Sequence, residues 1–252
     1  MRDFAMTYPQ LMNQAARLNV AEADLIRLRD GHELAQRLSD GLYRKEGAPF
    51  LCHLVRTASI VLVEVEGRDL DVVLATLLHA VYFLHYFERS SRRGPRAADR
   101  RFLRTRIGER AERLVTQCGA MSWNDADSLR GYLDDAGNSS SETRQLLLMQ
   151  LANELEDHLD AAVAYAPHVA ANTAYLRHGA LYVALAERLG HAILAGELRE
   201  AFEACRRTEV PAAVTQSGHG SYELTSRLWT ANLVERMGSS LRRYRERRSS
   251  QS

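Results

Sequence analysis

Apolar residues recur at intervals of three and four along most of the chain, which is the spacing of one face of an α-helix. The pattern is clear over residues 25–42 and 54–65, and again over residues 72–78. Alternating apolar and polar runs bounded by turn residues, which are typical of β-strands, are lacking. The sequence therefore predicts an all-α fold.

Polar residues mark where two of these helices begin. Asp69 is suited to cap the helix over residues 72–78, with Asp71 in its first turn. Ser139 is followed three residues later by Glu142, the spacing of a capping box. We therefore expect a further helix that opens near Ser139.

Three segments break the helical pattern and suggest how the chain is organised. Residues 86–100, rich in Arg and Ser, predict an exposed loop, and residues 119–127 predict a second connection. The role of the Arg-rich stretch over residues 89–106 stays open. Residues 1–209 are expected to form one helical domain. Residues 210–252 are expected to form a linker, a C-terminal helix packed on that domain, and a frayed basic tail.

Composition excludes several classes of partner. A net charge of +1 argues against a nucleic acid as the partner. The sequence has no run of 18 or more apolar residues, so we expect no membrane span. Cys52, Cys118 and Cys205 form no CxxC pair, which favours a reducing, cytoplasmic setting. Lys45 is the only lysine, and this bias toward arginine is typical of a high-GC bacterium. A homo-oligomer stays open.

Four landmarks in order carry a resemblance to a known family. They are Y43-R-K-E-G-A-P-F-L-C-H53, L77-L-H79-A80, L151-A-N-E-L-E-D157 and the stretch over residues 182–202. Together they resemble the HD-type hydrolase domain of the (p)ppGpp synthetase/hydrolase family, in a small form without the synthetase domain. The resemblance covers residues 30–205 and implies an α-helical HD-domain bundle of the alarmone-hydrolase type.

The resemblance also implies that the metal site of that family is degenerate here. In the family two histidines, an His-Asp pair and a distal aspartate hold a manganese ion. At these positions the chain carries Ser39, His53, His79 with Ala80, and Asn153. Two histidines survive and both carboxylates are absent, so we expect no metal and no cofactor.

The neighbouring positions point away from alarmone hydrolysis. The acidic pair of the family corresponds to Phe83 and Leu84, so a carboxylate to activate water is missing. Glu154 and Glu156 are expected to face solvent.

Several other residues are expected to line the pocket. Arg44 and Lys45 match an Arg-Lys pair that lies by the nucleotide in the family, and Asp157 stands where the family has an asparagine. Tyr82 and Phe83 would add aromatic surface. Ser39 and Asn153 complete the expected ligand-binding set, with Asn153 bonded to Ser39 or to a histidine.

Two functions from different classes follow. In the first, His53 and His79 perform metal-independent acid–base chemistry on a small, fairly apolar metabolite, by cyclisation, elimination, isomerisation or hydrolysis in specialised metabolism. In the second, the chain is an inactive pseudoenzyme that binds a nucleotide or a protein partner. For the two histidines, a buried structural role and weak metal binding helped by His85 or His158 also stay open.

Overall fold

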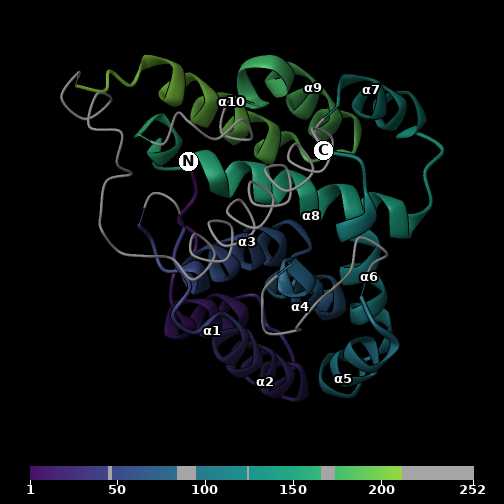
Figure 1. The fold of residues 1–252 in the computed structure, drawn as a ribbon. Coiled ribbons are helices and arrows are strands. Elements are labelled where there is room, and N and C mark those ends of the chain that lie inside the picture. Colours follow the sequence, from purple (N-terminus) through teal and green to yellow (C-terminus); the bar gives the residue numbers. More distant parts are fainter. Residues whose placement is uncertain (45–46, 84–94, 124, 166–173, 212–252) are drawn as a thin grey trace, which may run out of the picture.

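The computed structural model describes residues 1–44, 47–83, 95–123, 125–165 and 174–211. Within these ranges the chain forms ten α-helices and two short 3-10 helices, and no strand (Figure 1). The predicted all-α class is confirmed. No helix in the described ranges is long and apolar enough to cross a membrane.

The first half of the chain builds one side of the bundle. Its elements in chain order are α1 (Tyr8–Arg17), α2 (Glu22–Ser39), α3 (Phe50–Glu64), α4 (Leu70–Leu77) and the 3-10 helix η1 (Val81–Phe83). Asp69 caps α4 by accepting a hydrogen bond from the Val72 amide, and Asp71 lies in the first turn. The prediction for the start of this helix is therefore confirmed.

The second half continues around the bundle and returns across it. Its elements are α5 (Ala97–Ile107), α6 (Glu109–Ala120), α7 (Ala126–Asp135), α8 (Ser141–His158), η2 (Ala162–Tyr165), α9 (Ala174–Arg188) and α10 (Ala192–Arg207). The gap between α6 and α7 agrees with the connection predicted over residues 119–127. Residues 212–252, which include the predicted C-terminal helix and basic tail, lie outside the described residues.

Two predicted boundaries are wrong. The cap of α8 is Ser140, whose hydroxyl accepts a hydrogen bond from the Thr143 amide, whereas the Ser139 hydroxyl donates back to the Asp135 carbonyl. The loop predicted over residues 86–100 is already helical from Ala97, where α5 begins. The first error arises because two neighbouring serines compete for the same helix terminus and only the packed chain selects one. The second arises because no side chain caps α5 at Arg96, so its start carries no polar signal.

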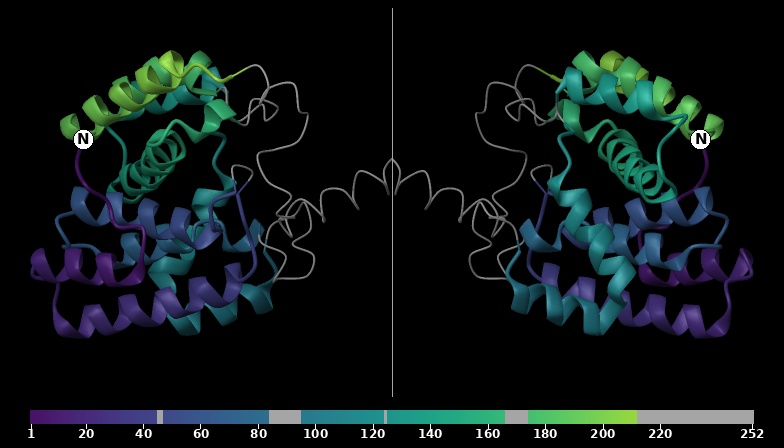
Figure 2. Two further views of the ribbon diagram at one scale, coloured as in Figure 1. Left: turned by 90° about the vertical axis from the view of Figure 1, so that its left-hand side faces the viewer. Right: turned by 90° about the vertical axis from the view of Figure 1, so that its right-hand side faces the viewer.

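Helix α8 runs through the middle of the molecule. It packs on α3 on one side and on α10 and α9 on the other (Figures 1 and 2). Its buried residues surround the helix axis and include three that can carry charge, Glu154, Glu156 and His158. A central helix of this kind brings polar groups into contact with several neighbours at once.

The N-terminal segment ties the two sides together. Arg2 donates hydrogen bonds to Glu64 at the end of α3 and to Glu197 on α10, at 2.6 and 2.7 Å. Both carboxylates are buried, and His191 also contacts Glu64, at 2.5 Å. The chain start therefore lies beside α10, as Figure 1 shows.

Candidate functional site

The two histidines of the predicted site lie side by side. His53 comes from the first turn of α3, and His79 follows the end of α4. Their ring centroids are 5.2 Å apart, with the rings edge to face at 67°. His53 is buried and His79 is half-buried. The structure thus brings together the pair that the sequence singled out.

A short turn before α3 carries Arg44 to these histidines. The Arg44 amide donates to the Ala48 carbonyl at 2.8 Å, and the Gly47 amide donates to the Arg44 carbonyl at 3.0 Å. Gly47 has φ +91°, a left-handed conformation that glycine adopts without strain. This turn reverses the chain and places the Arg44 side chain against the start of α3.

The Arg44 guanidinium contacts three groups at once. Its Nη1 lies 2.5 Å from Nδ1 of His53 and 3.4 Å from Oε2 of Glu156, and its Nη2 donates to Oδ1 of Asp157 at 2.7 Å. His53 Nδ1 also contacts Oε2 of Glu156 directly. Two carboxylates from α8 therefore belong to the site.

A second arginine holds Glu156 from the other side. Arg56, one turn beyond His53 on α3, donates through Nε to Oε1 of Glu156 at 2.9 Å and through Nη2 to Asp160 at 3.2 Å. Glu156 is only 3% exposed. Burial raises the pKa of this carboxyl even though the positive charges of Arg44 and Arg56 act against the shift.

Both histidines are neutral at physiological pH. Burial lowers the pKa of His53 to about 3, and the charges of Arg44 and Arg56 act in the same direction. Burial and the nearby His53 lower the pKa of His79 to about 4. His79 Nδ1 lies 2.8 Å from the Thr76 carbonyl, so this nitrogen carries the proton and donates it. Its Nε2 then holds a lone pair.

The expectation that Glu154 and Glu156 face solvent is wrong. They are 6% and 3% exposed, because α8 is central and has no fully solvated face at its end. Glu156 and Asp157 lie three and four residues after Asn153, so the three share one helix face. The comparison with the family had already named Asp157 as a pocket residue but missed Glu156, for which this spacing was the available signal.

Two of the expected ligand-binding residues point elsewhere. The buried Ser39 hydroxyl donates to the Ala35 carbonyl within α2, at 2.7 Å. The Tyr82 hydroxyl donates to Glu112 on α6 at 2.9 Å and is part of the core. Neither group is directed at the histidines.

The other expected residues are placed as follows. Asn153 Nδ2 lies 3.5 Å from Asp157, and neither Ser39 nor a histidine is its partner among the described residues. His158 is buried against Tyr175 and Phe202, with Nδ1 on its own helix at the Glu154 carbonyl. Lys45, Leu84, His85 and the Phe83 side chain lie outside the described residues.

The residues at the family's metal positions do not fit a manganese ion. Ser39 is engaged within its own helix, Ala80 has no donor atom, and Asn153 offers a neutral amide. A different set, His53, Glu156 and Asp157, does place three donor atoms within 4.8 Å of one another. The Arg44 guanidinium contacts all three of these groups.

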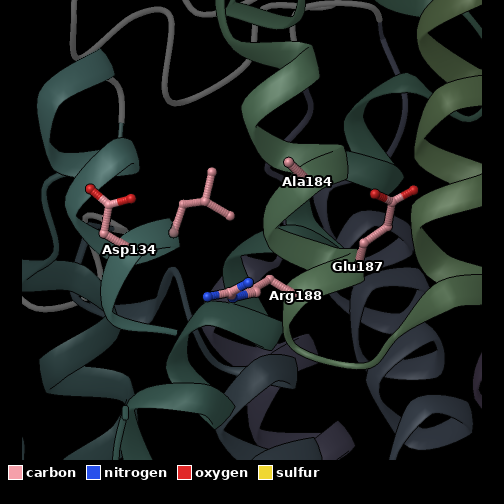
Figure 3. Close-up of a pocket in the computed structure, with 5 residues that line it drawn as sticks. Asp134, Ala184, Glu187 and Arg188 are labelled. Carbon is pink, nitrogen blue, oxygen red and sulfur yellow. The ribbon is translucent and has the colours of Figure 1, made fainter. Parts of the chain in front are cut away.

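A separate hollow lies between α7 and α9. It measures about 600 Å³ and is lined by Leu133, Asp134, Ala184, Glu187 and Arg188 (Figure 3). Glu187 pairs with Arg199 on α10, at 2.8 Å. Since α7 and α9 contribute no residue to the histidine cluster, this hollow is distinct from the predicted site.

Comparison with known proteins finds one family model and similar solved structures. The model of a domain of unknown function, DUF6817, matches residues 34–122. A solved structure described as a metazoan ortholog of SpoT, which hydrolyses ppGpp and plays a role in starvation responses, is 19% identical with a TM-score of 0.48. The match covers 71% of this chain and 94% of that one. No curated protein matches the sequence.

Proposed function

We propose that the chain is an enzyme that uses His53 and His79 for metal-independent acid–base chemistry on a small, fairly apolar metabolite. The observation that carries the proposal is the geometry of His79. The Thr76 carbonyl fixes the proton on Nδ1, which leaves the Nε2 lone pair as a proton acceptor beside a second neutral imidazole. A fixed tautomer orients the lone pair that a general base uses to accept a proton.

In this proposal His79 Nε2 accepts a proton from the substrate, and the resulting imidazolium returns it later in the reaction. Burial and His53 hold the pKa of His79 at about 4, while the charges of Asp157 and Glu156 act in the opposite direction and favour the protonated form. Cyclisation, elimination, isomerisation and hydrolysis all need such a transfer. A positioned base of this kind contributes about 10²- to 10⁴-fold in rate.

The surroundings support a substrate of low charge. The Phe50 ring lies 5.3 Å from the His53 ring, which adds apolar surface beside the imidazoles. Arg44 is already paired with Asp157 and Glu156, so a phosphate would have to compete with two carboxylates for it. This pairing counts against the alternative, a pseudoenzyme that binds a nucleotide through Arg44.

Removing the two imidazoles separately tests the proposal. Wild type and the variants His79→Ala and His53→Ala are incubated, after EDTA treatment, with a small-molecule extract, and consumed compounds are followed by mass spectrometry. We expect wild type to consume at least one compound and His79→Ala to lose at least 10²-fold of that rate. His32→Gln, a buried histidine on α2 that stacks on Tyr8, serves as the control.

Two results would overturn the proposal. One is turnover that disappears with EDTA and returns with a divalent metal. The other is tight binding of guanosine tetraphosphate in calorimetry, with no compound consumed, which would establish the nucleotide-binding alternative.

A further inference from the structure

We propose that the Arg44 guanidinium occupies the cation position of a ligand set built from His53, Glu156 and Asp157, and that removing its charge converts this set into a divalent metal site. The ligands Glu156 and Asp157 are not at the family's metal positions. The inference goes beyond the proposed function, because it concerns metal affinity and not turnover.

The first argument is the convergence of donor atoms. His53 Nδ1, a Glu156 oxygen and an Asp157 oxygen all lie within 4.8 Å of one another, and the Nδ1 to Asp157 distance is 3.7 Å. Ligands at about 2.0–2.2 Å from a tetrahedral zinc ion stand roughly 3.4 Å apart. Small side-chain adjustments would therefore complete three coordination positions.

The second argument is that Arg44 contacts the same atoms a metal would bind. Its Nη1 contacts both His53 Nδ1 and Oε2 of Glu156, and its Nη2 binds Oδ1 of Asp157. A guanidinium and a metal ion cannot both occupy this position. Metal binding and the Arg44 contacts are thus mutually exclusive.

The third argument concerns the single in-plane lone pair of His53 Nδ1. Both Nη1 of Arg44 and Oε2 of Glu156 contact this nitrogen. An unprotonated Nδ1 accepts a hydrogen bond from Arg44, whereas a hydrogen bond to the Glu156 carboxylate needs a proton on Nδ1, so the two contacts require opposite tautomers of His53. A metal ion would use the lone pair of the imidazole and both carboxylates without this conflict.

The charge balance also favours a cation once Arg44 is removed. The single positive charge of Arg56 is divided between two ion pairs, one with Glu156 and one with Asp160. Without Arg44, Asp157 would have no arginine partner among the described residues, and part of the charge of Glu156 would be left uncompensated beside a neutral imidazole. Asp157 is 28% exposed, but Glu156 is buried, and an uncompensated buried charge is strongly unfavourable, so a divalent ion would be stabilised in the position of the guanidinium.

The donor set specifies which ions should bind. One imidazole nitrogen with two carboxylate oxygens suits first-row transition ions such as zinc or manganese. Magnesium prefers an all-oxygen environment and retains several waters, so it should bind this set poorly. Selectivity is therefore part of the inference.

The test measures metal bound per chain after equilibrium dialysis against zinc, manganese or magnesium, together with the Tm in each metal. We expect Arg44→Met to bind one zinc or manganese ion at least 100-fold more tightly than wild type, with a raised Tm. The double variant Arg44→Met/Glu156→Gln should bind the metal at least tenfold more weakly than Arg44→Met alone. Arg37→Met, an exposed arginine on α2, should behave as wild type.

Two outcomes would overturn the inference. In one, wild type binds zinc as tightly as Arg44→Met, so that Arg44 is not the occupant. In the other, folded Arg44→Met binds no more than wild type. If Arg44→Met does not fold, Arg44→Gln, which keeps hydrogen-bonding capacity without the charge, is measured in the same way. These outcomes are independent of whether His79→Ala loses turnover.

Discussion

Glu112 on α6 and Glu154 on α8 are both buried, yet their surroundings drive them to opposite charge states. Burial alone would raise the pKa of Glu112, but hydrogen bonds from Arg100, Arg104, Thr116 and Tyr82 outweigh it and lower the pKa to about 2. For Glu154, burial and the negative Asp157 raise the pKa to about 8, against a single hydrogen bond from the Trp123 indole.

The difference shows that the partners of a buried carboxylate decide its ionisation, more than its depth does. Glu112 has two arginines, at 2.7 and 2.8 Å, and stays ionised. Glu154 forms no ion pair within the described ranges and keeps its proton at neutral pH. The surroundings of Glu156 are intermediate between these two cases. Its carboxylate contacts two arginines, Arg44 and Arg56, and also the His53 imidazole, which Arg44 contacts as well.

The largest effect is expected from Glu112→Gln. It removes the charge that holds Arg100, Arg104 and Tyr82 together, and breaking a buried ion pair costs about 3–5 kcal/mol. The free energy of unfolding at pH 7, measured in urea, should fall by that amount. Arg101→Gln, an exposed arginine on α5, should change it by less than about 0.5 kcal/mol.

The pH dependence of the same variant provides a check. Since the pKa of Glu112 is lowered from its ordinary value of 4.5 to about 2, its contribution is full above pH 4.5 and is lost as pH falls toward 2. The gap between wild type and variant should narrow over this range. A gap that is constant with pH would mean that Glu112 acts through packing and not through charge.

Glu154→Gln should have the opposite pH dependence. The pKa of Glu154 is raised, so the folded state binds the extra proton between pH 4.5 and 8 and wild type loses stability as pH rises through this window. The amide mimics the protonated acid and does not titrate. We expect equal stability at pH 5 and an advantage for the variant on the order of 2–4 kcal/mol at pH 9.

Urea unfolding at pH 5, 7 and 9 measures this difference. The control is Glu33→Gln, an exposed glutamate on α2. If the stability of Glu154→Gln fell with pH as steeply as that of wild type, Glu154 would not be the buried acid described above.

The smallest effect is expected from Trp123→Phe. The aromatic ring still stacks on Tyr182, whose ring centroid is 5.3 Å away, but the 2.9 Å hydrogen bond to Glu154 is lost. Loss of one such bond costs about 1 kcal/mol. Thermal unfolding at pH 6 measures it, with Tyr132→Phe, on a residue that also stacks with Trp123, as the control. Equal Tm values for the two variants would mean that the indole N–H contributes nothing.

The sequence located part of the candidate site but missed one of its two carboxylates, Glu156. The landmark motifs singled out His53 and His79, which the structure places in contact. The same comparison gave Asn153 as the successor of a lost carboxylate and placed Asp157 in the pocket, but it assigned Glu156 to solvent. Glu156 and Asp157, one turn further along α8, supply carboxylates to that place, so the site is more acidic than the sequence comparison implied.

The sequence by itself determined the helical fold, because the spacing of apolar residues at intervals of three and four is a local property of the chain. It also fixed which residue types were available for chemistry. Only the tertiary structure decided that Glu154 and Glu156 are buried, since this depends on α3, α9 and α10 enclosing α8. It likewise decided that Arg44, from a turn before α3, meets Asp157 from α8, because ionic partners 113 residues apart leave no local pattern.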